Sequence, residues 1–370
     1  MAAAAMNLHH PSHRKLLRRA TEATPLTKPD ALVVPTIRSP HRLEHAVKLA
    51  AELECQLVLL CSQKWSSAAT ATDLYRHSGA RILAVDVPEP HRLALPRFRT
   101  DALLRDTVFE RRSDLSAKRN LALLLAKQLG WGNIVFLDDD ILVPRSHDLR
   151  LAAGLLRRHE VVGLDNTGYP DNSVVCHAFR AIGGPQDSFV GGGAMAVRTT
   201  RVRSFFPNIY NEDWFYLLKD RGLREVGVAG KVEQQPYDPF RTDERARAEE
   251  FGDLLAEGLY WLLDEGNDLV KADRGYWMEA ISRRRRFIDH ILAHDHGQRP
   301  GLADALLAAR GRLTRHITAD LCVSYLDAWR RDRETWRKFV HTVHRTDSPD
   351  EALSRWNITT PDNKRVLTSH

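Results

Sequence analysis

The chain has 370 residues, of which 43% are hydrophobic, and its formal net charge is +6 at pH 7. Its mean hydropathy is -0.39, and no uninterrupted apolar stretch approaches the roughly 20 residues of a membrane helix, which excludes a bilayer-spanning protein. Residues 1–28 carry four of the six net positive charges, so the remainder is close to neutral and a pure nucleic-acid binder is disfavoured.

The amino-terminal segment and the cysteines indicate the compartment. Residues 1–28 mix alanine, histidine and basic residues without the apolar core of about 7 to 15 residues that a signal peptide needs, and we expect a disordered tail. Four cysteines, spaced without a C-x-x-C motif, do not form the dense framework of a disulfide scaffold. These features favour a cytoplasmic protein.

From residue 31 the sequence alternates between short apolar runs and amphipathic stretches. Residues 31–34, 56–60 and 81–85 are typical of strands, and residues 43–53 and 67–77 have helical spacing. This order predicts a Rossmann-like α/β fold, a mostly parallel sheet joined by right-handed crossovers with helices on both faces.

A further strand is predicted at residues 131–140, after a helix that Ser113-Asp114 can cap. It ends in Asp138-Asp139-Asp140, at the sheet edge where open α/β folds bind ligands. If the strand stays extended, Asp138 and Asp140 leave it on the same side, about 7 Å apart. Hard oxygen ligands at that spacing suit Mg²⁺ or Mn²⁺. The alternative is a solvated acidic turn that caps the next helix.

The second half of the chain changes character twice. Residues 165–193 are rich in Gly, Asn, Pro and Asp, which predicts irregular, mobile loops. Beyond Pro239 the pattern is helical and charged, so we expect a domain at residues 29–240 and a helical subdomain at residues 241–370, with a loose tail from Pro361.

Four motifs follow one another, with the glycine-rich loop Gly191-Gly192-Gly193 before the last. They are Val33-Val34-Pro35-Thr36-x-Arg38, Ala117-Lys118-Arg119-Asn120, Asp138-Asp139-Asp140 and Asn211-Glu212-Asp213-Trp214. In their order and spacing they resemble a nucleotide-sugar-dependent glycosyltransferase of the GT-A fold, closest to family 2, over roughly residues 31–235. The resemblance implies transfer of a glycosyl group from a nucleoside diphosphate sugar to an acceptor hydroxyl.

The resemblance also assigns roles to residues. It implies that Asp140 contacts the metal and that Asp138 faces the ribose or sugar, while Asp139 lies between them. Pro35, Thr36 and Arg38 would form part of the nucleotide pocket, and Arg119 would contact the donor. Asn120 is more typical of a helix-to-loop hydrogen bond. Each arginine could equally be an ordinary surface or helix charge.

The acceptor requires a base, because a hydroxyl has a pKa far above 7. Asp213 matches the base of inverting relatives, with Glu212 as the fallback, and Trp214 would exclude water and raise the carboxyl pKa. Residues 211–213 could instead only cap the helix that follows. Gly191, Gly192 and Gly193 let the backbone approach a sugar closely, as would a plain flexible turn.

The sequence departs from the family pattern at the position that recognises the nucleobase. Relatives often carry an aspartate directly after the second strand, whereas here Cys61-Ser62-Gln63 follows it; Asp86, after the third strand, could substitute. The main alternative is a retaining transferase on the same fold. A non-catalytic protein that binds a nucleotide or anion through Arg283–Arg286 is another. The donor and acceptor are left open, and the helical region could complete the acceptor pocket, mediate homodimerisation, or both.

Overall fold

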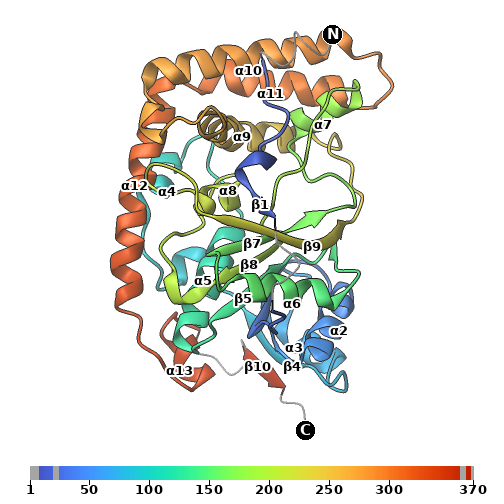
Figure 1. Ribbon diagram of the computed structural model, residues 1–370, viewed down its shortest axis with the longest axis vertical. Helices are drawn as coiled ribbons and strands as arrows, with labels where there is room; N and C mark the ends of the chain where they lie inside the picture. Colours follow the sequence, from blue (N-terminus) through green and yellow to red (C-terminus); the bar gives the residue numbers. More distant parts are fainter. Residues whose placement is uncertain (1–7, 20–24, 359–363, 368–370) are drawn as a thin grey trace.

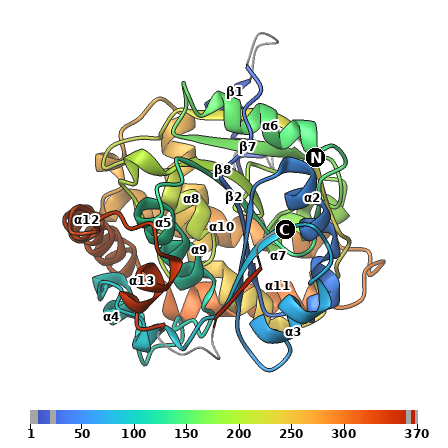
Figure 2. The ribbon, with the colours of Figure 1, turned by 90° about the horizontal axis from the view of Figure 1, so that it is seen from below.

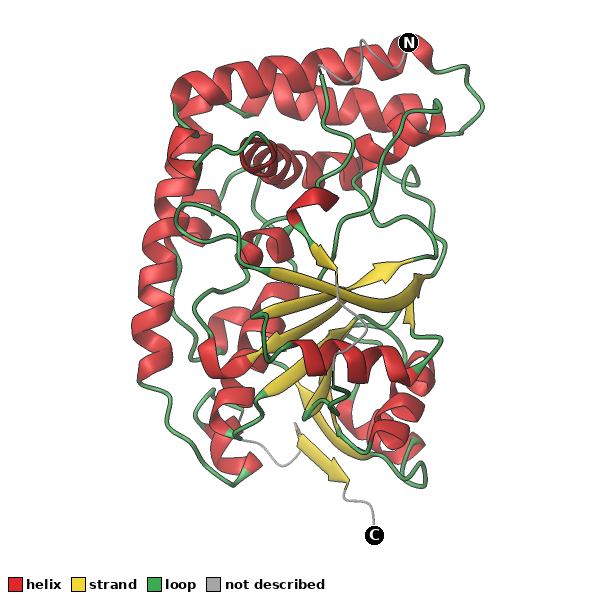
Figure 3. Cartoon of the chain, viewed as in Figure 1, coloured by secondary structure: helices red, strands yellow, loops and turns green. Residues whose placement is uncertain are grey.

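The computed structural model describes residues 8–19, 25–358 and 364–367. The protein has a mixed α/β fold (Figure 3). The strands are β1 (Arg18–Arg19), β2 (Ala31–Thr36), β3 (Gln56–Cys61), β4 (Arg81–Asp86), β5 (Asn133–Leu137), β6 (Ile141–Leu142), β7 (Val161–Asn166), β8 (Ala194–Arg198), β9 (Val226–Gln234) and β10 (Lys364–Leu367). They form one sheet in the order β1-β9-β7-β8-β5-β2-β3-β4-β10, and β6 pairs with β9.

The sheet is mostly parallel, as predicted. Strands β2, β3, β4 and β5 are parallel neighbours, and β2 lies between β3 and β5. Strand β8 is antiparallel to both β5 and β7, and β10 is antiparallel to β4. The chain therefore moves outward from β2 through β3 to β4, and then returns to place β5 on the other side of β2.

Helices cover both faces and continue into a helical layer at one end (Figure 1). They are α2 (Glu44–Leu53), α3 (Ala68–Leu74), α4 (Arg99–Leu104), α5 (Leu115–Gln128), α6 (Ser146–Leu155), α7 (Val174–Ala181), α8 (Glu212–Leu217), α9 (Asp243–Asp264), α10 (Arg274–His294), α11 (Leu302–His316), α12 (Ala319–His341) and α13 (Pro349–Ser354). Short 3-10 turns are η1 (Arg14–Leu16), η2 (Pro40–Leu43), η3 (Pro90–Arg92), η4 (Thr199–Arg201) and η5 (Leu269–Lys271).

Alternation along the buried strands divides the core into two apolar layers. Val33 packs into the layer that contains α5, whereas Val34 packs into the layer that contains α2 and α6. Seen along the long axis, α2 and α6 lie on one side of the sheet and α5 on the other (Figure 2). Because both faces are covered, the strands are continuous hydrophobic runs.

The helical region shares its core with the sheet. One apolar cluster extends from Val33 and Phe136 in the sheet to Leu259 of α9, Trp277 of α10 and Trp329 of α12. Helices α10 and α11 lie side by side, and α12 runs along one edge of the molecule (Figure 1). The division at residue 240 stays a prediction. Within the described parts of the chain, no helix combines the length and apolar character needed to cross a membrane.

Two local predictions were wrong. The strand expected at residues 131–140 ends at Leu137, and the three aspartates form the turn that follows. The loop expected at residues 165–193 contains α7, whose first backbone N–H groups are held by Ser173 Oγ and the Glu249 carboxylate. Glu249 lies on α9, so this capping partner is remote in sequence.

The amino-terminal segment also differs from the expectation. Residues 1–7 and 20–24 lie outside the described residues, but His13 and η1 pack on α9, and β1 pairs with β9. His9 and His13 are buried there. Composition alone suggested a loose tail because the partners of these histidines are far along the chain. At the other end, β10 pairs with β4, while residues 361–363 and 368–370 lie outside the described residues.

Candidate active site

The candidate site lies at the carboxyl ends of β2 and β5. These two strands are neighbours, and the connections from them leave in opposite directions along the sheet. Such a reversal opens a crevice between the loops that follow the two strands. Thr36 and Arg38 follow β2, and Asp138, Asp139 and Asp140 follow β5. The sheet order therefore brings together two motifs about 100 residues apart.

The turn after β5 is fixed by backbone hydrogen bonds rather than by strand alternation. Ile141 N donates to Asp138 O at 3.1 Å, and Gln235 N of the β9 side donates to Asp140 O at 3.1 Å. The short strand β6 then pairs with β9. Asp138 and Asp140 share this edge of the sheet because the chain turns, not because the strand continues.

Arg38 joins two of the aspartates. Its Nε lies 3.2 Å from Asp139 Oδ1, and its guanidinium donates to Asp140 Oδ2 at 2.9 Å. Thr36 Oγ1 donates to the other oxygen of Asp139 at 2.6 Å. Asp139 is thus held by groups from the β2 loop. Asp140 accepts from a half-exposed arginine that could turn toward a ligand.

Arg119 links Asp138, the first aspartate of the turn, to Glu212 of the last motif. This buried side chain donates to both oxygens of Asp138 at 3.0 and 3.1 Å and to Glu212 Oε1 at 2.5 Å. Burial raises the pKa of Asp138, and the Arg119 charge opposes that shift. Glu212 is occupied as the partner of Arg119. Asn120, on the same helix, bonds the backbone of Phe206 in both directions, the helix-to-loop role expected for it.

Asp213 lies in the first turn of α8. Its Oδ2 accepts from Gly192 N at 2.5 Å, and its Oδ1 accepts from Trp214 N at 2.9 Å. Burial raises its pKa, and the Arg119 charge lowers it in part. The residue before α8, Asn211, makes no side-chain capping bond. Asp213 therefore satisfies backbone groups and also presents a perturbed carboxyl group.

The glycine turn is where backbone and charged groups approach most closely. Asp138 N donates to Gly193 O at 2.9 Å. A Cβ atom at Gly192 would lie 2.6 Å from the Arg119 guanidinium, and one at Gly191 would lie 2.9 Å from Asp171 Oδ2. Larger residues would displace these side chains, which explains the glycines better than flexibility alone.

Trp214 packs against α9. Its ring centroid lies 4.5 Å from that of Tyr260 and 5.0 Å from that of Phe189. Tyr260 also donates to the Trp214 carbonyl at 3.1 Å. These contacts fix the start of α8 and cover one side of Asp213.

Sequence reasoning missed Asp171, in the loop after β7. Desolvation in the cleft and the charges of Asp138 and Asp140 raise the pKa of Asp171 to about 6. Nothing in the pattern around Asp171 distinguishes it from other loop aspartates. Arg111 was also missed; its guanidinium lies 3.9 Å from Glu212.

A buried lysine supports the β2 loop. Lys118 Nζ donates to Thr36 O at 2.9 Å and to Ser62 Oγ at 2.6 Å, and it lies 3.2 Å from Asp114. Asp86, the substitute nucleobase reader, accepts from Ala68 N at 2.8 Å and so caps α3. The polar groups that lie beside the β2 loop at the end of β3 are therefore those of Ser62, Asp114 and Lys118.

The cleft holds more negative than positive side chains. Its carboxylates are Asp138, Asp139, Asp140, Asp171, Glu212 and Asp213. The cations that contact them are Arg38, Arg111 and Arg119. Such an excess of oxygen donors suits a hard divalent cation. Magnesium is commonly held by one or two carboxylates, with waters and substrate phosphates completing the shell.

Comparisons with known proteins include a distant likeness to a solved structure. No family model matches the sequence, and no curated protein matches it. Among solved structures, the chain is similar to the mannosyltransferase PcManGT from Pyrobaculum calidifontis in complex with GDP-Man and Mn2+, at 15% sequence identity and a TM-score of 0.42. The likeness covers 92% of this chain and 93% of that chain. It is too distant to assign a function.

Proposed function

We propose that this chain is a divalent-metal-dependent glycosyltransferase of the GT-A type that uses a nucleoside diphosphate sugar and inverts the anomeric centre. The observation that carries the proposal is the group of incompletely balanced carboxylates at the end of β5, beside the loop that follows β2. A diphosphate with its cation fits such a cleft, because the cation balances both sets of oxygens.

In this proposal the donor is held by residues from two strand ends. Asp138 and Asp140 would hold Mn²⁺ or Mg²⁺, which when bound neutralises charge on the departing diphosphate. Arg38 is half-exposed and would exchange its contact with Asp140 for a phosphate oxygen. Pro35, Thr36 and Asp139 shape the loop beside the nucleotide. Arg119 keeps Asp138 in place, and Glu212 positions Arg119.

Asp213 is the proposed base. It takes the proton of the acceptor hydroxyl while that oxygen bonds to the anomeric carbon, and the bond from that carbon to the diphosphate oxygen breaks. The raised pKa of Asp213 favours accepting the proton. Gly191, Gly192 and Gly193 let the backbone approach the sugar, and Trp214 shields one side of the base from water. Retention of configuration would remove this role from Asp213.

Calorimetry with a panel of nucleoside diphosphate sugars tests the proposal. Metal-stripped protein is titrated with and without added Mn²⁺, for the wild type, Asp140→Asn and the control Asp73→Asn. Asp73 pairs only with its surface neighbour Arg76 among the contacts described for it, at 2.8 Å. We expect metal-dependent binding of at least one donor in the wild type and the control, and its loss in Asp140→Asn. Equal binding by Asp140→Asn, or no binding by the wild type, would contradict the proposal.

A further inference from the structure

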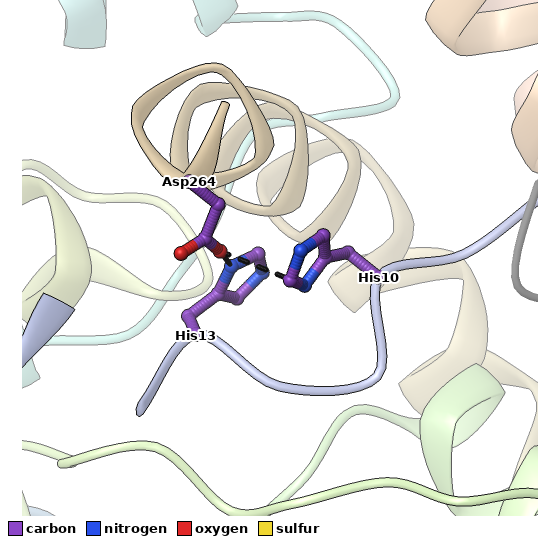
Figure 4. Close-up of side chains that lie close together, drawn as sticks. All are labelled: His10, His13 and Asp264. Atoms are coloured by element: carbon purple, nitrogen blue, oxygen red, sulfur yellow. Dashed lines mark hydrogen bonds and ion pairs between the residues drawn. The ribbon is translucent and has the colours of Figure 1, made fainter. Parts of the chain in front are cut away.

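A second group of metal-ligating side chains lies where the amino-terminal segment meets α9, beside Trp214. The segment that contains His10 and His13 crosses the carboxyl end of α9, where Asp264 ends the helix (Figure 4). One potential ligand atom from each of these three residues lies within 4.8 Å of the other two. No other group of histidine, cysteine or acidic side chains among the described residues meets that distance.

The geometry suits a tetrahedral ion. His13 Nδ1 contacts Asp264 Oδ2 directly, and His10 Nδ1 lies 3.5 Å from the same oxygen. Ligands about 2.0 to 2.2 Å from a tetrahedral zinc ion are roughly 3.3 Å apart, so small side-chain movements would complete the set. The two imidazole rings are stacked with centroids 4.9 Å apart, and both Nδ1 atoms face the carboxylate (Figure 4).

The outer ring nitrogen of His13 already has its partner. His13 Nε2 lies 3.0 Å from Glu257 Oε2, and Glu257 precedes Asp264 by two turns of α9. Metal-bound histidines usually donate their second N–H to a carboxylate or carbonyl, which fixes the ring and selects the nitrogen that faces the metal. Glu257 is placed to do this for a metal on Nδ1.

Two atoms of the cluster lack hydrogen bonds. The Asp264 side chain is fully buried, and its Oδ1 accepts no hydrogen bond; Lys15 Nζ is 3.5 Å away. The Nδ1 atom of His10 is also buried without a hydrogen bond. Buried polar atoms are normally satisfied, so these two point to an absent partner. A cation between the rings and the carboxylate would satisfy both.

We propose that His10, His13 and Asp264 bind a transition-metal ion, for which zinc is the best match. Two imidazoles and one carboxylate form a borderline-soft ligand set that suits zinc, whereas the oxygen-only cleft suits Mg²⁺ or Mn²⁺. This site is separate from the cleft and does not depend on the proposed function.

The ion would fasten the amino-terminal segment across a loop that leads to the glycine turn. Asp187 N donates to Pro11 O at 2.9 Å, Arg14 donates to Ser188 O at 3.1 Å, and His9 bonds Gln186. The His13 ring also lies edge-on to Trp214, with centroids 5.7 Å apart. Metal binding at His10 and His13 would therefore hold both the segment and this loop in place.

Zinc affinity measured by competition with a chromophoric chelator tests the proposal. Full-length, metal-stripped protein is used with excess Mg²⁺, which occupies oxygen-only sites. His10→Ala should fold, because His10 is only partly buried and makes no hydrogen bond through Nδ1. His296→Ala is the matched control, since His296 is exposed beyond the end of α10.

The wild type, His296→Ala and Asp140→Asn should bind one zinc ion that His10→Ala does not bind. Glu257→Gln should bind it roughly 10- to 100-fold more weakly, as expected for loss of an outer partner. Cobalt in the site should give visible absorption of a tetrahedral ion without a thiolate charge-transfer band. The proposal is overturned if His10→Ala binds zinc like the wild type, if Asp140→Asn loses it instead, or if the wild type binds none.

Discussion

Two groups of charged side chains differ in how completely their carboxylates are paired with arginine. In the helical region, Arg284 donates to both oxygens of Glu250 at 3.0 Å and to Asp253 at 2.5 Å. Burial raises the pKa of Glu250 to about 7, and both carboxylates of the group contact the arginine. In the cleft, Asp138, Asp139, Asp140 and Glu212 contact an arginine, whereas Asp171 and Asp213 form no ion pair with an arginine among the described residues.

The comparison distinguishes charged side chains that stabilise the fold from charged side chains that would bind a ligand. A buried group in which every carboxylate contacts the arginine is held together internally and joins α9 to α10. A group with excess charge is costly unless a ligand completes it. The four predictions below test this distinction by changing one charge at a time, in the cleft or in the Arg284 group.

The largest effect is expected for Asp213→Asn. An amide cannot take the acceptor proton, so turnover should fall by about 10² to 10⁴ while donor binding is kept. The wild-type rate should fall as the pH drops through the raised pKa of Asp213, and the variant should lack this acid limb. Initial rates and calorimetry on both proteins measure this. Unchanged turnover would remove Asp213 from catalysis.

Arg119→Met should cost about 3 kcal/mol of stability or more, because it leaves the buried Glu212 and the partly buried Asp138 without their partner. Added Mg²⁺ should restore part of the loss, since the cation supplies charge to the same carboxylates. Denaturant unfolding with and without Mg²⁺ measures both the loss of stability and the part that Mg²⁺ restores. A variant that Mg²⁺ stabilises no more than it stabilises the wild type would argue against a cation in the cleft.

Arg284→Met should cost somewhat less, about 3 kcal/mol, because Glu250 can take a proton and leave only Asp253 charged. Mg²⁺ should give no additional rescue. The same unfolding experiment, run beside Arg119→Met, makes the two regions directly comparable. The donor affinity of the folded Arg284→Met protein should match that of the wild type. If Mg²⁺ restored the stability of Arg284→Met as it restores that of Arg119→Met, the proposed difference between the two regions would be wrong.

The last prediction is a change in the pH dependence of stability for Glu250→Gln. The pKa of Glu250 is above its ordinary value of 4.5, so the native state holds more protons than the unfolded state between about pH 4.5 and 7. Wild-type stability should therefore lose up to about 1.4 kcal/mol per pH unit as the pH rises through this window. The glutamine variant should lack that slope in unfolding curves from pH 4 to 8. An identical slope in both proteins would show that Glu250 does not titrate there.

Local patterns in the sequence determined the parallel half of the sheet and the edge that carries the aspartates. Apolar runs such as Ile134–Leu137 are continuous because both faces of the strand are buried, and this can be read without knowing the partners. The alternation of strand and helix from β2 to β4 then follows from chain order. Asp138 and Asp140 were predicted as candidate site residues because these charged side chains directly follow the apolar run.

Only the tertiary structure decided which distant groups meet. Glu212 is the partner of Arg119, Asp171 joins the cleft from an irregular loop, and the first histidines pack on α9 rather than forming a loose tail. Hydrophobic periodicity reports the burial of a segment but not its neighbours, which depend on sheet order and loop paths. Which carboxylates are paired with an arginine depends on such long-range contacts. The pairing could therefore not be predicted from the sequence alone.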